Sequence, residues 1–213
     1  MTSPQPHTLT EPTPATLPAV PGHLRRIVLT GFMGAGKSTI GRLLAARIGW
    51  NFLDVDTHLE ARTSATIPQL FERHGEAHFR RLESSALASA LSRSQTVLAL
   101  GGGAPEELTN RLLIEQTPAT FTIFLDAPFP MLYDRCMLQE IGRPVLADLE
   151  AAEARFARRH PLYRRISRLT IDTAAITPEQ TVEAILTALS AALNQSQPES
   201  NSALPRPSAC GAH

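Results

Sequence analysis

The residues with the clearest chemical role lie between Gly31 and Ser38, which read Gly-Phe-Met-Gly-Ala-Gly-Lys-Ser. The spacing G-x-x-x-x-G-K-S is that of a phosphate-binding loop (P-loop), and it lies between a short apolar run and a helical pattern, as the motif requires. Glycines allow backbone N–H groups to surround an anion, and the dipole of the following helix favours the same negative charge. Lys37 is expected to reach the β- and γ-phosphates of a nucleotide, and the Ser38 hydroxyl is expected to bind Mg²⁺.

A glycine-rich turn with an incidental lysine is the alternative interpretation of this loop. Lys37 is, however, the only lysine in the chain, and every other position of the Lys and Arg total is an arginine. A chain that otherwise uses arginine keeps a compact ammonium group here, where a planar guanidinium cannot take its place. The loop therefore favours a bound nucleoside triphosphate.

Two aspartates, Asp54 and Asp56, stand at the end of the short strand expected over residues 51–54. With a P-loop upstream, one is expected to act on Mg²⁺ through water and the other to bind a hydroxyl of the acceptor substrate. Phosphoryl transfer depends on in-line placement and neutralised oxygens more than on acid–base strength. The alternative is a strand-to-helix turn in which an aspartate only caps the helix.

Gly101, Gly102 and Gly103 directly follow a strand of buried type expected over residues 96–100. Successive glycines cost backbone entropy and add no packing, which indicates that another group approaches this backbone closely. A plain flexible loop is the alternative.

Arg80, Arg143 and Arg159 are candidates for anion binding, although most arginines are solvated surface residues. Arg143 lies in a Gly- and Pro-containing break at 141–147, which predicts a mobile flap able to close over a transferring phosphate. Arg80 stands three residues before Glu83 on a predicted helix, so the glutamate can orient its guanidinium.

These residues must be positioned by strands that alternate with helices along the chain. Such alternation predicts a parallel sheet covered by helices on both faces, with ligands at the carboxyl ends of the strands. The P-loop, the two aspartates and the glycines all follow expected strands, so they should converge on one cleft. The expected strands are 27–29, 51–54, 96–100, 120–125 and 168–171. The expected helices are 37–49, 57–62, 66–73, 76–93, 105–116, 128–139, 149–160 and 178–193, the last capped by Thr177.

The whole chain has the composition of a globular protein with one core, at 213 residues with 43% hydrophobic and 19% charged residues. A net charge of zero argues against nucleic acid as a partner, and no apolar run approaches the ~20 residues of a membrane span. Two distant cysteines, Cys136 and Cys210, predict neither a disulfide framework nor a zinc site and fit a reducing cytoplasm.

Both ends of the chain are expected to lie outside the folded domain, which we place at 23–193. Residues 1–22 are rich in Pro and Thr and lack the charged and apolar regions of a signal peptide. Residues 194–213 are similarly polar and contain proline. We predict that both segments are disordered.

In this order and spacing, the motifs resemble the shikimate kinase family, small P-loop enzymes of the nucleoside-monophosphate-kinase structural group. The resemblance extends over about residues 25–190. The matching motifs are Gly31–Ser38 followed by Thr39-Ile40-Gly41-Arg42, Asp54-Val55-Asp56, Gly75-Glu76-Ala77-His78-Phe79-Arg80, Leu100-Gly101-Gly102-Gly103, Gly142-Arg143-Pro144 and Arg159-His160-Pro161-Leu162-Tyr163.

The resemblance implies a three-layer α/β/α fold with a five-stranded parallel sheet in the order 2-3-1-4-5 and a mobile lid at about 140–148. It also implies transfer of the γ-phosphate of ATP to the 3-hydroxyl of shikimate in aromatic amino-acid biosynthesis, with one Mg²⁺ per subunit. Shikimate and ATP would be the only partners. We expect a monomer, because a small kinase that closes around its substrates needs a free lid.

For the acceptor side, the resemblance assigns the reacting diol to Asp56 and the substrate carboxylate to Arg80 and Arg159. The backbone amides of Gly101, Gly102 and Gly103 would contact the ring of the substrate.

For the donor side, the resemblance assigns charge stabilisation on the transferring group to Lys37 and Arg143, and the metal to Ser38 and, through water, Asp54. The catalytic set is thus Lys37, Asp56 and Arg143. The nucleotide-binding residues implied are Gly34, Ala35, Gly36, Lys37, Ser38, Thr39, Arg135, Arg143 and Pro178, with Arg135 and Pro178 flanking adenine.

Two other classes of protein fit the sequence less well. A GTPase would need a guanine-reading Asn-Lys-x-Asp, which is absent because Lys37 is the only lysine. A degenerate kinase that only binds nucleotide would be expected to have lost Lys37, Asp56 or Arg143. The closest rival is a gluconate or nucleoside-monophosphate kinase, against which stand the expected carboxylate-binding arginines and the glycine run.

Overall fold

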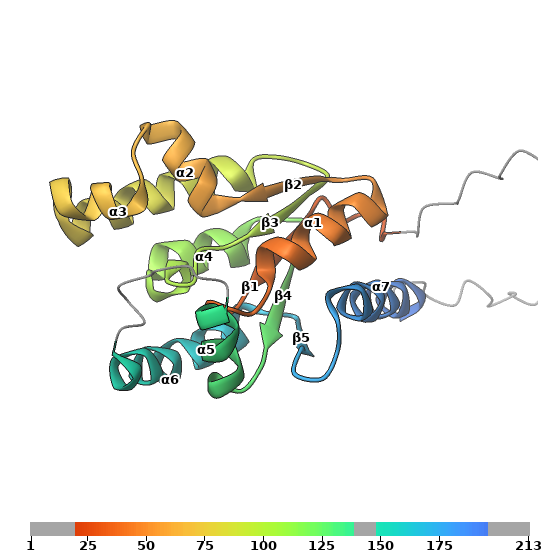
Figure 1. Ribbon diagram of the computed structural model, residues 1–213. Coiled ribbons are helices and arrows are strands. Elements are labelled where there is room, and N and C mark those ends of the chain that lie inside the picture. The colour runs from red at the N-terminus through yellow and green to blue at the C-terminus, as the bar shows by residue number, and fades with distance from the viewer. Residues whose placement is uncertain (1–19, 139–147, 196–213) are drawn as a thin grey trace, which may run out of the picture.

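The computed structural model describes residues 20–138 and 148–195. A five-stranded parallel sheet forms its centre, in the order β2-β3-β1-β4-β5, and helices cover both faces (Figure 1). The three-layer arrangement and the strand order are those predicted. The strands are β1 (Arg26–Thr30), β2 (Asn51–Asp54), β3 (Thr96–Ala99), β4 (Thr120–Asp126) and β5 (Leu169–Asp172). The helices are α1 (Lys37–Ile48), α2 (Val55–Thr63), α3 (Ile67–Leu91), the 3₁₀ turn η1 (Ala104–Glu106), α4 (Leu108–Gln116), α5 (Phe129–Leu138), α6 (Leu149–Ile166) and α7 (Pro178–Gln195).

The sheet is buried on both faces, as a parallel sheet between two helical layers must be. In β1, Ile27 and Leu29 belong to the core cluster that includes Leu44 of α1, whereas Val28 belongs to the cluster that includes Leu87 of α3. All five side chains are fully buried. Alternation along a strand therefore supplies two cores from one short apolar run.

The carboxyl ends of the strands meet at one edge of the sheet. Leu29 of β1 is level with Ala99 of β3 and with Ile123 of β4, and Asp54 of β2 is also level with Ala99. The P-loop, the Asp54–Asp56 segment and the glycine run all follow at this edge. The convergence predicted from the sequence is confirmed.

Helices α2 and α3 lie together at the β2 edge, away from α7 (Figure 1). Helix α3 begins with a capping box formed by Thr66 and Gln69 and bends at Gly75, where φ is 74° and ψ is 173°. These dihedral angles are not helical, so the break expected at Gly75, between helices at 66–73 and 76–93, is confirmed, and glycine adopts this backbone conformation without strain.

Three expected boundaries were wrong. Pro105 lies in the η1 turn and the helix begins only at Leu108, while α2 begins at Val55 because Asp54 caps it. Helix α6 continues through Pro161 to Ile166. Burial of the following turn against the sheet outweighs the cost of a proline inside a helix. The predicted cap of α7 is confirmed, since Gln180 N donates to Thr177 Oγ1 at 3.2 Å.

The predicted flap at 141–147, with Arg143, lies outside the described residues, as do most of 1–22 and 194–213. Of the expected lid at about 140–148, only Asp148 is described, and it caps α6 by accepting a hydrogen bond from Ala151 N.

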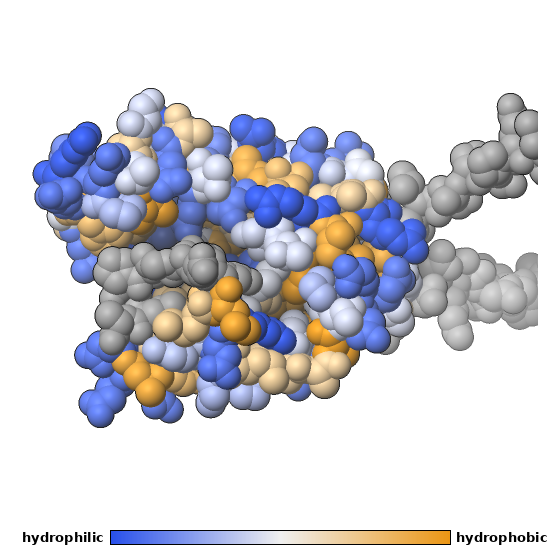
Figure 2. Space-filling view, in the orientation of Figure 1, coloured by the Kyte–Doolittle hydropathy of each residue, from blue (hydrophilic) through white to orange (hydrophobic). Residues whose placement is uncertain are grey.

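The surface seen in Figure 2 is mainly hydrophilic over α2 and α3. Large exposed hydrophobic side chains are spread over α1, α3, α4, α5 and α6 and do not gather on one helix. Among the helices of the described segments, none has the length and apolar character to cross a membrane.

Candidate active site

The P-loop forms the turn from β1 into α1. Gly34 and Gly36 have φ of 78° and 81°, values that L-residues with side chains rarely adopt. A Cβ on Gly34 would also lie 2.9 Å from Cys136 Sγ of α5. Glycine is therefore required at these positions by backbone conformation and by close packing, and the interpretation as an incidental glycine-rich turn loses its support.

Lys37, the first residue of α1, folds back over the loop that precedes it. Its Nζ donates to Gly31 O at 2.8 Å and to Phe32 O at 3.0 Å. These carbonyls hold the ammonium group across the loop, where it can meet the terminal phosphates of a bound nucleotide.

Ser38, in the first turn of α1, lies beside Asp54, the last residue of β2. Ser38 Oγ donates to Asp54 Oδ2 at 2.6 Å, while Asp54 Oδ1 accepts from Asp56 N at 3.1 Å and from Thr57 N at 3.4 Å. Asp54 thus caps α2 and also contacts the P-loop serine. A hydroxyl and a carboxylate at this point are the hard oxygen donors that Mg²⁺ prefers, so these residues fit the metal.

The glycine run lies between the P-loop and helix α6. A Cβ on Gly101 would collide with Asp56 Oδ1, and one on Gly102 would lie 3.9 Å from Gly31 O. The buried Tyr163 hydroxyl donates to Gly102 O at 2.6 Å. The close approach predicted from three glycines is confirmed, and it connects the donor loop with Asp56.

Arg80 of α3 and Arg159 of α6 converge on Gly103, and we call this pair the arginine clamp. A Cβ on Gly103 would lie 2.9 Å from Arg80 Nη1 and 3.1 Å from Arg159 Nη2. The two side chains are only 15% and 11% exposed. Two largely enclosed guanidinium groups at one point form a site for a planar anion such as a carboxylate.

Glu83 orients Arg80, as the spacing on the helix predicted. Arg80 Nη1 donates to Glu83 Oε2 at 3.0 Å, and Arg80 Nη2 donates to Glu76 Oε1 at 3.1 Å. Glu83 is 2% exposed, and this burial raises its pKa to about 7 against the opposing effect of Arg80. Glu83 is therefore a carboxyl group whose charge changes near neutral pH.

Sequence reasoning missed Glu106, which binds both Arg158 and Arg159 of α6. Burial alone would raise the pKa of Glu106, but hydrogen bonds from the two arginines hold it below its usual value. The available signal was a glutamate three residues after the glycine run. Its partners are more than fifty residues further along the chain, so no local pattern connects them.

Two expected nucleotide-binding residues, Arg135 and Pro178, lie on α5 and at the start of α7. Arg135 of α5 donates to Thr173 O at 2.7 Å and to Thr173 Oγ1 at 3.3 Å, next to the end of β5. Pro178 is the first residue of α7. Helix α5 packs against the P-loop, because a Cβ on Gly34 would collide with Leu132 O and Cys136 Sγ, whereas Arg143 lies beyond the described residues.

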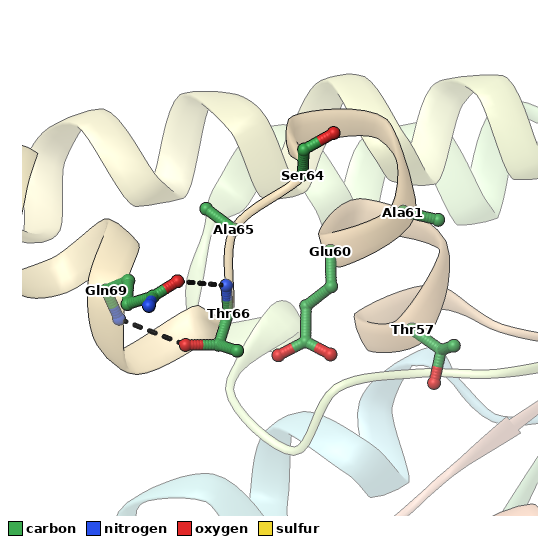
Figure 3. A pocket seen from close by; sticks show the side chains of 7 residues that line it. All are labelled: Thr57, Glu60, Ala61, Ser64, Ala65, Thr66 and Gln69. Carbon is green, nitrogen blue, oxygen red and sulfur yellow. Dashed lines mark hydrogen bonds between the residues drawn. The ribbon is translucent and has the colours of Figure 1, made fainter.

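A separate hollow of about 340 Å³ lies between α2 and α3 (Figure 3). Its polar groups serve the helix ends, since Thr66 and Gln69 form the capping box and Glu60 Oε1 accepts from Ile67 N at 2.9 Å. These bonds explain the polar lining without a ligand.

This site combines a P-loop with a serine–aspartate pair beside it and, across the glycine run, the arginine clamp. Such a combination is typical of a kinase that holds a nucleotide on the P-loop and a small anionic acceptor at the clamp. The comparisons with known proteins agree. The family model for shikimate kinase matches residues 33–190. A shikimate kinase of Bordetella avium is 39% identical over 168 residues, covering 78% of this chain and 79% of that protein. A shikimate kinase of Bradyrhizobium diazoefficiens is 40% identical over 174 residues, covering 79% and 81%.

Solved structures give the same result. Shikimate kinase from Acinetobacter baumannii in complex with shikimate has 35% identity and a TM-score of 0.74, with 82% of this chain and 96% of that chain covered. Deoxyadenosine kinase from M. mycoides, at 15% identity and a TM-score of 0.52, shares the fold alone. This chain therefore belongs to the shikimate kinase family.

Proposed function

We propose that this chain transfers the γ-phosphate of ATP to the 3-hydroxyl of shikimate, giving shikimate 3-phosphate and ADP for aromatic amino-acid biosynthesis. The observation that carries the proposal is the arginine clamp beside the glycine run, across from the P-loop. Shikimate has a carboxylate, and two guanidinium groups bind such a planar anion with charge-assisted hydrogen bonds. The Acinetobacter baumannii relative, which is similar over most of its length, binds shikimate.

On the donor side, backbone amides from Gly34 to Thr39 surround the phosphates. Lys37 stabilises charge on the transferring group, assisted by Arg143. One Mg²⁺ per subunit, held by Ser38 and through water by Asp54, would neutralise the phosphate oxygens.

The nucleotide base would lie further from the transferring phosphate. Arg135 and Pro178 flank the adenine in this proposal, at the side of the sheet where β5 ends and α7 begins.

On the acceptor side, Asp56 orients the reacting diol, and the clamp of Arg80 and Arg159 fixes the carboxylate. Amides of Gly101–Gly103 contact the ring. Holding the acceptor at two points places its hydroxyl in line with the phosphate, and such positioning supplies much of the rate enhancement in phosphoryl transfer.

The proposed enzyme works as a monomer in the cytoplasm, with small molecules as its partners. The buried free thiol of Cys136 fits a reducing compartment. The net charge of zero fits a protein that does not bind nucleic acid.

A coupled ADP-release assay with shikimate, gluconate, CMP and AMP as acceptors tests the proposal. Turnover is expected with shikimate and Mg-ATP alone. Gluconate and the nucleotides are the relevant competitors, because a sugar kinase with 21% identity and a TM-score of 0.54 shares this fold. Phosphorylation of gluconate or a nucleotide, without phosphorylation of shikimate, would refute the assignment.

A further inference from the structure

Glu106 lies beside the arginine clamp, yet the transfer proposed above does not use it. It is the last residue of the η1 turn, and its backbone N–H donates to Gly103 O at 2.9 Å. Because this turn begins directly after the glycine run, it brings the Glu106 side chain against α6, where 18% of the side chain is exposed.

The Glu106 carboxylate binds two adjacent arginines of α6, one with each oxygen. Oε2 accepts a hydrogen bond from Arg159 Nε at 2.9 Å and lies 2.6 Å from Arg159 Nη2. Oε1 accepts a hydrogen bond from Arg158 Nε at 2.9 Å and lies 2.8 Å from Arg158 Nη2. Both contacts use the side edge of a guanidinium, formed by Nε and Nη2, and charge-assisted bonds of this kind fix its orientation.

The end edge of the Arg159 guanidinium, formed by Nη1 and Nη2, lies toward the glycine run. A Cβ on Gly102 would lie 3.8 Å from Arg159 Nη1, and a Cβ on Gly103 would lie 3.1 Å from Arg159 Nη2. Arg80 Nη1 reaches the same point beside Gly103. Because Glu106 binds the side edge of the Arg159 guanidinium, the end edge faces Gly103, next to the guanidinium of Arg80.

Glu106 also balances charge on this part of α6. Burial lowers the pKa of Arg155, the charges of Arg159 and Arg158 lower it further, and the charge of Glu106 acts in the opposite direction. Glu106 Oε2 lies 3.8 Å from Arg80 Nη2 as well as in contact with Arg159. One carboxylate oxygen thus draws together two side chains that would otherwise repel each other.

We propose that Glu106 is a positioning residue that sets the affinity for the acceptor carboxylate. It fixes the side edge of Arg159 so that the end edge meets the substrate beside Arg80. The inference rests on the proposed function, because it requires a carboxylate-bearing acceptor at the clamp. If Glu106 were instead an internal carboxylate that the substrate must displace, its removal would strengthen binding, which is the opposite sign.

Glu106→Gln tests the proposal, because it keeps the size of the side chain and removes its charge. The KM for shikimate is expected to rise about tenfold, the effect of about one charge-assisted hydrogen bond, with kcat and the KM for ATP within about twofold of wild type. Glu106→Asp keeps the charge and is expected to restore part of the affinity. In an Arg159→Ala background, Glu106→Gln should change the KM little, because its effect passes through Arg159.

An unchanged or lowered KM for shikimate in Glu106→Gln overturns the proposal, and so does a lower Tm without a change in KM. Glu183→Gln is the matched control, because it removes a carboxylate charge from a surface ion pair with Arg47. The side chains of Glu183 and Arg47 are 61% and 48% exposed. This variant should leave both KM values unchanged. Failure of the proposed function is a different result, namely a wild-type chain that does not turn over shikimate at all.

Discussion

The donor and acceptor halves of this site are built in different ways. The donor half is one continuous stretch, in which Lys37 bonds to carbonyls five and six residues before it. The acceptor half draws Asp56, Arg80, Gly102 and Arg159 from four separate segments of the chain. It is held by ion pairs and by one buried tyrosine hydroxyl.

This difference predicts that substitutions in the two halves change different kinetic constants. A backbone loop with one ammonium group acts on charge that develops during transfer, so damage there should lower kcat. A clamp of guanidinium groups binds a carboxylate that does not react, so damage there should mainly raise the KM for the acceptor. The following predictions test this division, from the largest expected effect to the smallest.

Lys37→Met is expected to abolish turnover, with a fall in kcat of at least about a thousandfold, which corresponds to roughly 4 kcal/mol of barrier. The reason is the loss of the only ammonium group near the transferring phosphate. ADP release measures the effect, with circular dichroism to check the fold and shikimate titration to check the acceptor half. Lys37→Arg should also be inactive, because a planar guanidinium does not fit the loop. A rate within tenfold of wild type for Lys37→Met would contradict the role.

Arg159→Ala is expected to weaken shikimate binding by ~2–5 kcal/mol, because a buried carboxylate loses its charged partner. Calorimetric titration measures the loss, and the affinity for ATP should stay unchanged. Arg164→Ala is the matched control, since Arg164 also lies on α6 but pairs with Asp126 and has a side chain that is 67% exposed. Unchanged shikimate affinity in Arg159→Ala would remove this residue from the clamp.

Gly101→Ala is expected to lower kcat/KM for shikimate by about tenfold or more, because a Cβ there collides with Asp56 and overpacking typically costs ~1–3 kcal/mol. Steady-state kinetics with each substrate varied in turn measure the effect. Gly22→Ala is the control, because no atom lies within 4 Å of a Cβ at that position. Equal losses of kcat/KM in the two variants would show that the loss does not come from the contact between position 101 and Asp56.

Shikimate affinity is expected to rise about threefold as the pH falls from about 8 to about 6, because of Glu83. Burial raises the pKa of Glu83 to about 7, with Arg80 opposing and Asp56 and Glu107 adding to the rise. A bound carboxylate adds negative charge nearby and raises this pKa further. Binding therefore takes up protons, and affinity increases as the pH falls through about 7.

The KM for shikimate at several pH values measures this dependence. Glu83→Gln should flatten it, because the titrating group is gone. A slope that persists in Glu83→Gln would assign the pH dependence to another group, such as a histidine.

Apolar runs and glycines are local signals, and they predicted the parallel sheet, its two helical layers and nearly every element. The strand order followed only from the resemblance to the shikimate kinase family. The break inside α3 was predicted at Gly75, because a glycine after a helical pattern is such a local signal. The end of α6 was placed too early, at His160, because burial of Tyr163 and Ile166 is a property of the packed molecule.

The candidate site likewise contains features that the sequence could predict and contacts that it could not. The close approach at the glycines could be predicted, since only glycine fits where another group contacts the backbone. The contacts of Glu106 could not, because ion pairs between distant segments leave no periodic pattern in the sequence.

The sequence by itself determined the donor loop of this protein. Eight consecutive residues carry the backbone conformation, the ammonium group and the hydroxyl that a nucleotide triphosphate requires. The tertiary structure alone decided the geometry of the clamp. Which edge of Arg159 is held by Glu106, and which lies beside Arg80, depends on the packing of η1, α3 and α6 against one another. Those contacts arise only when segments far apart in the chain are brought together by burial of the sheet.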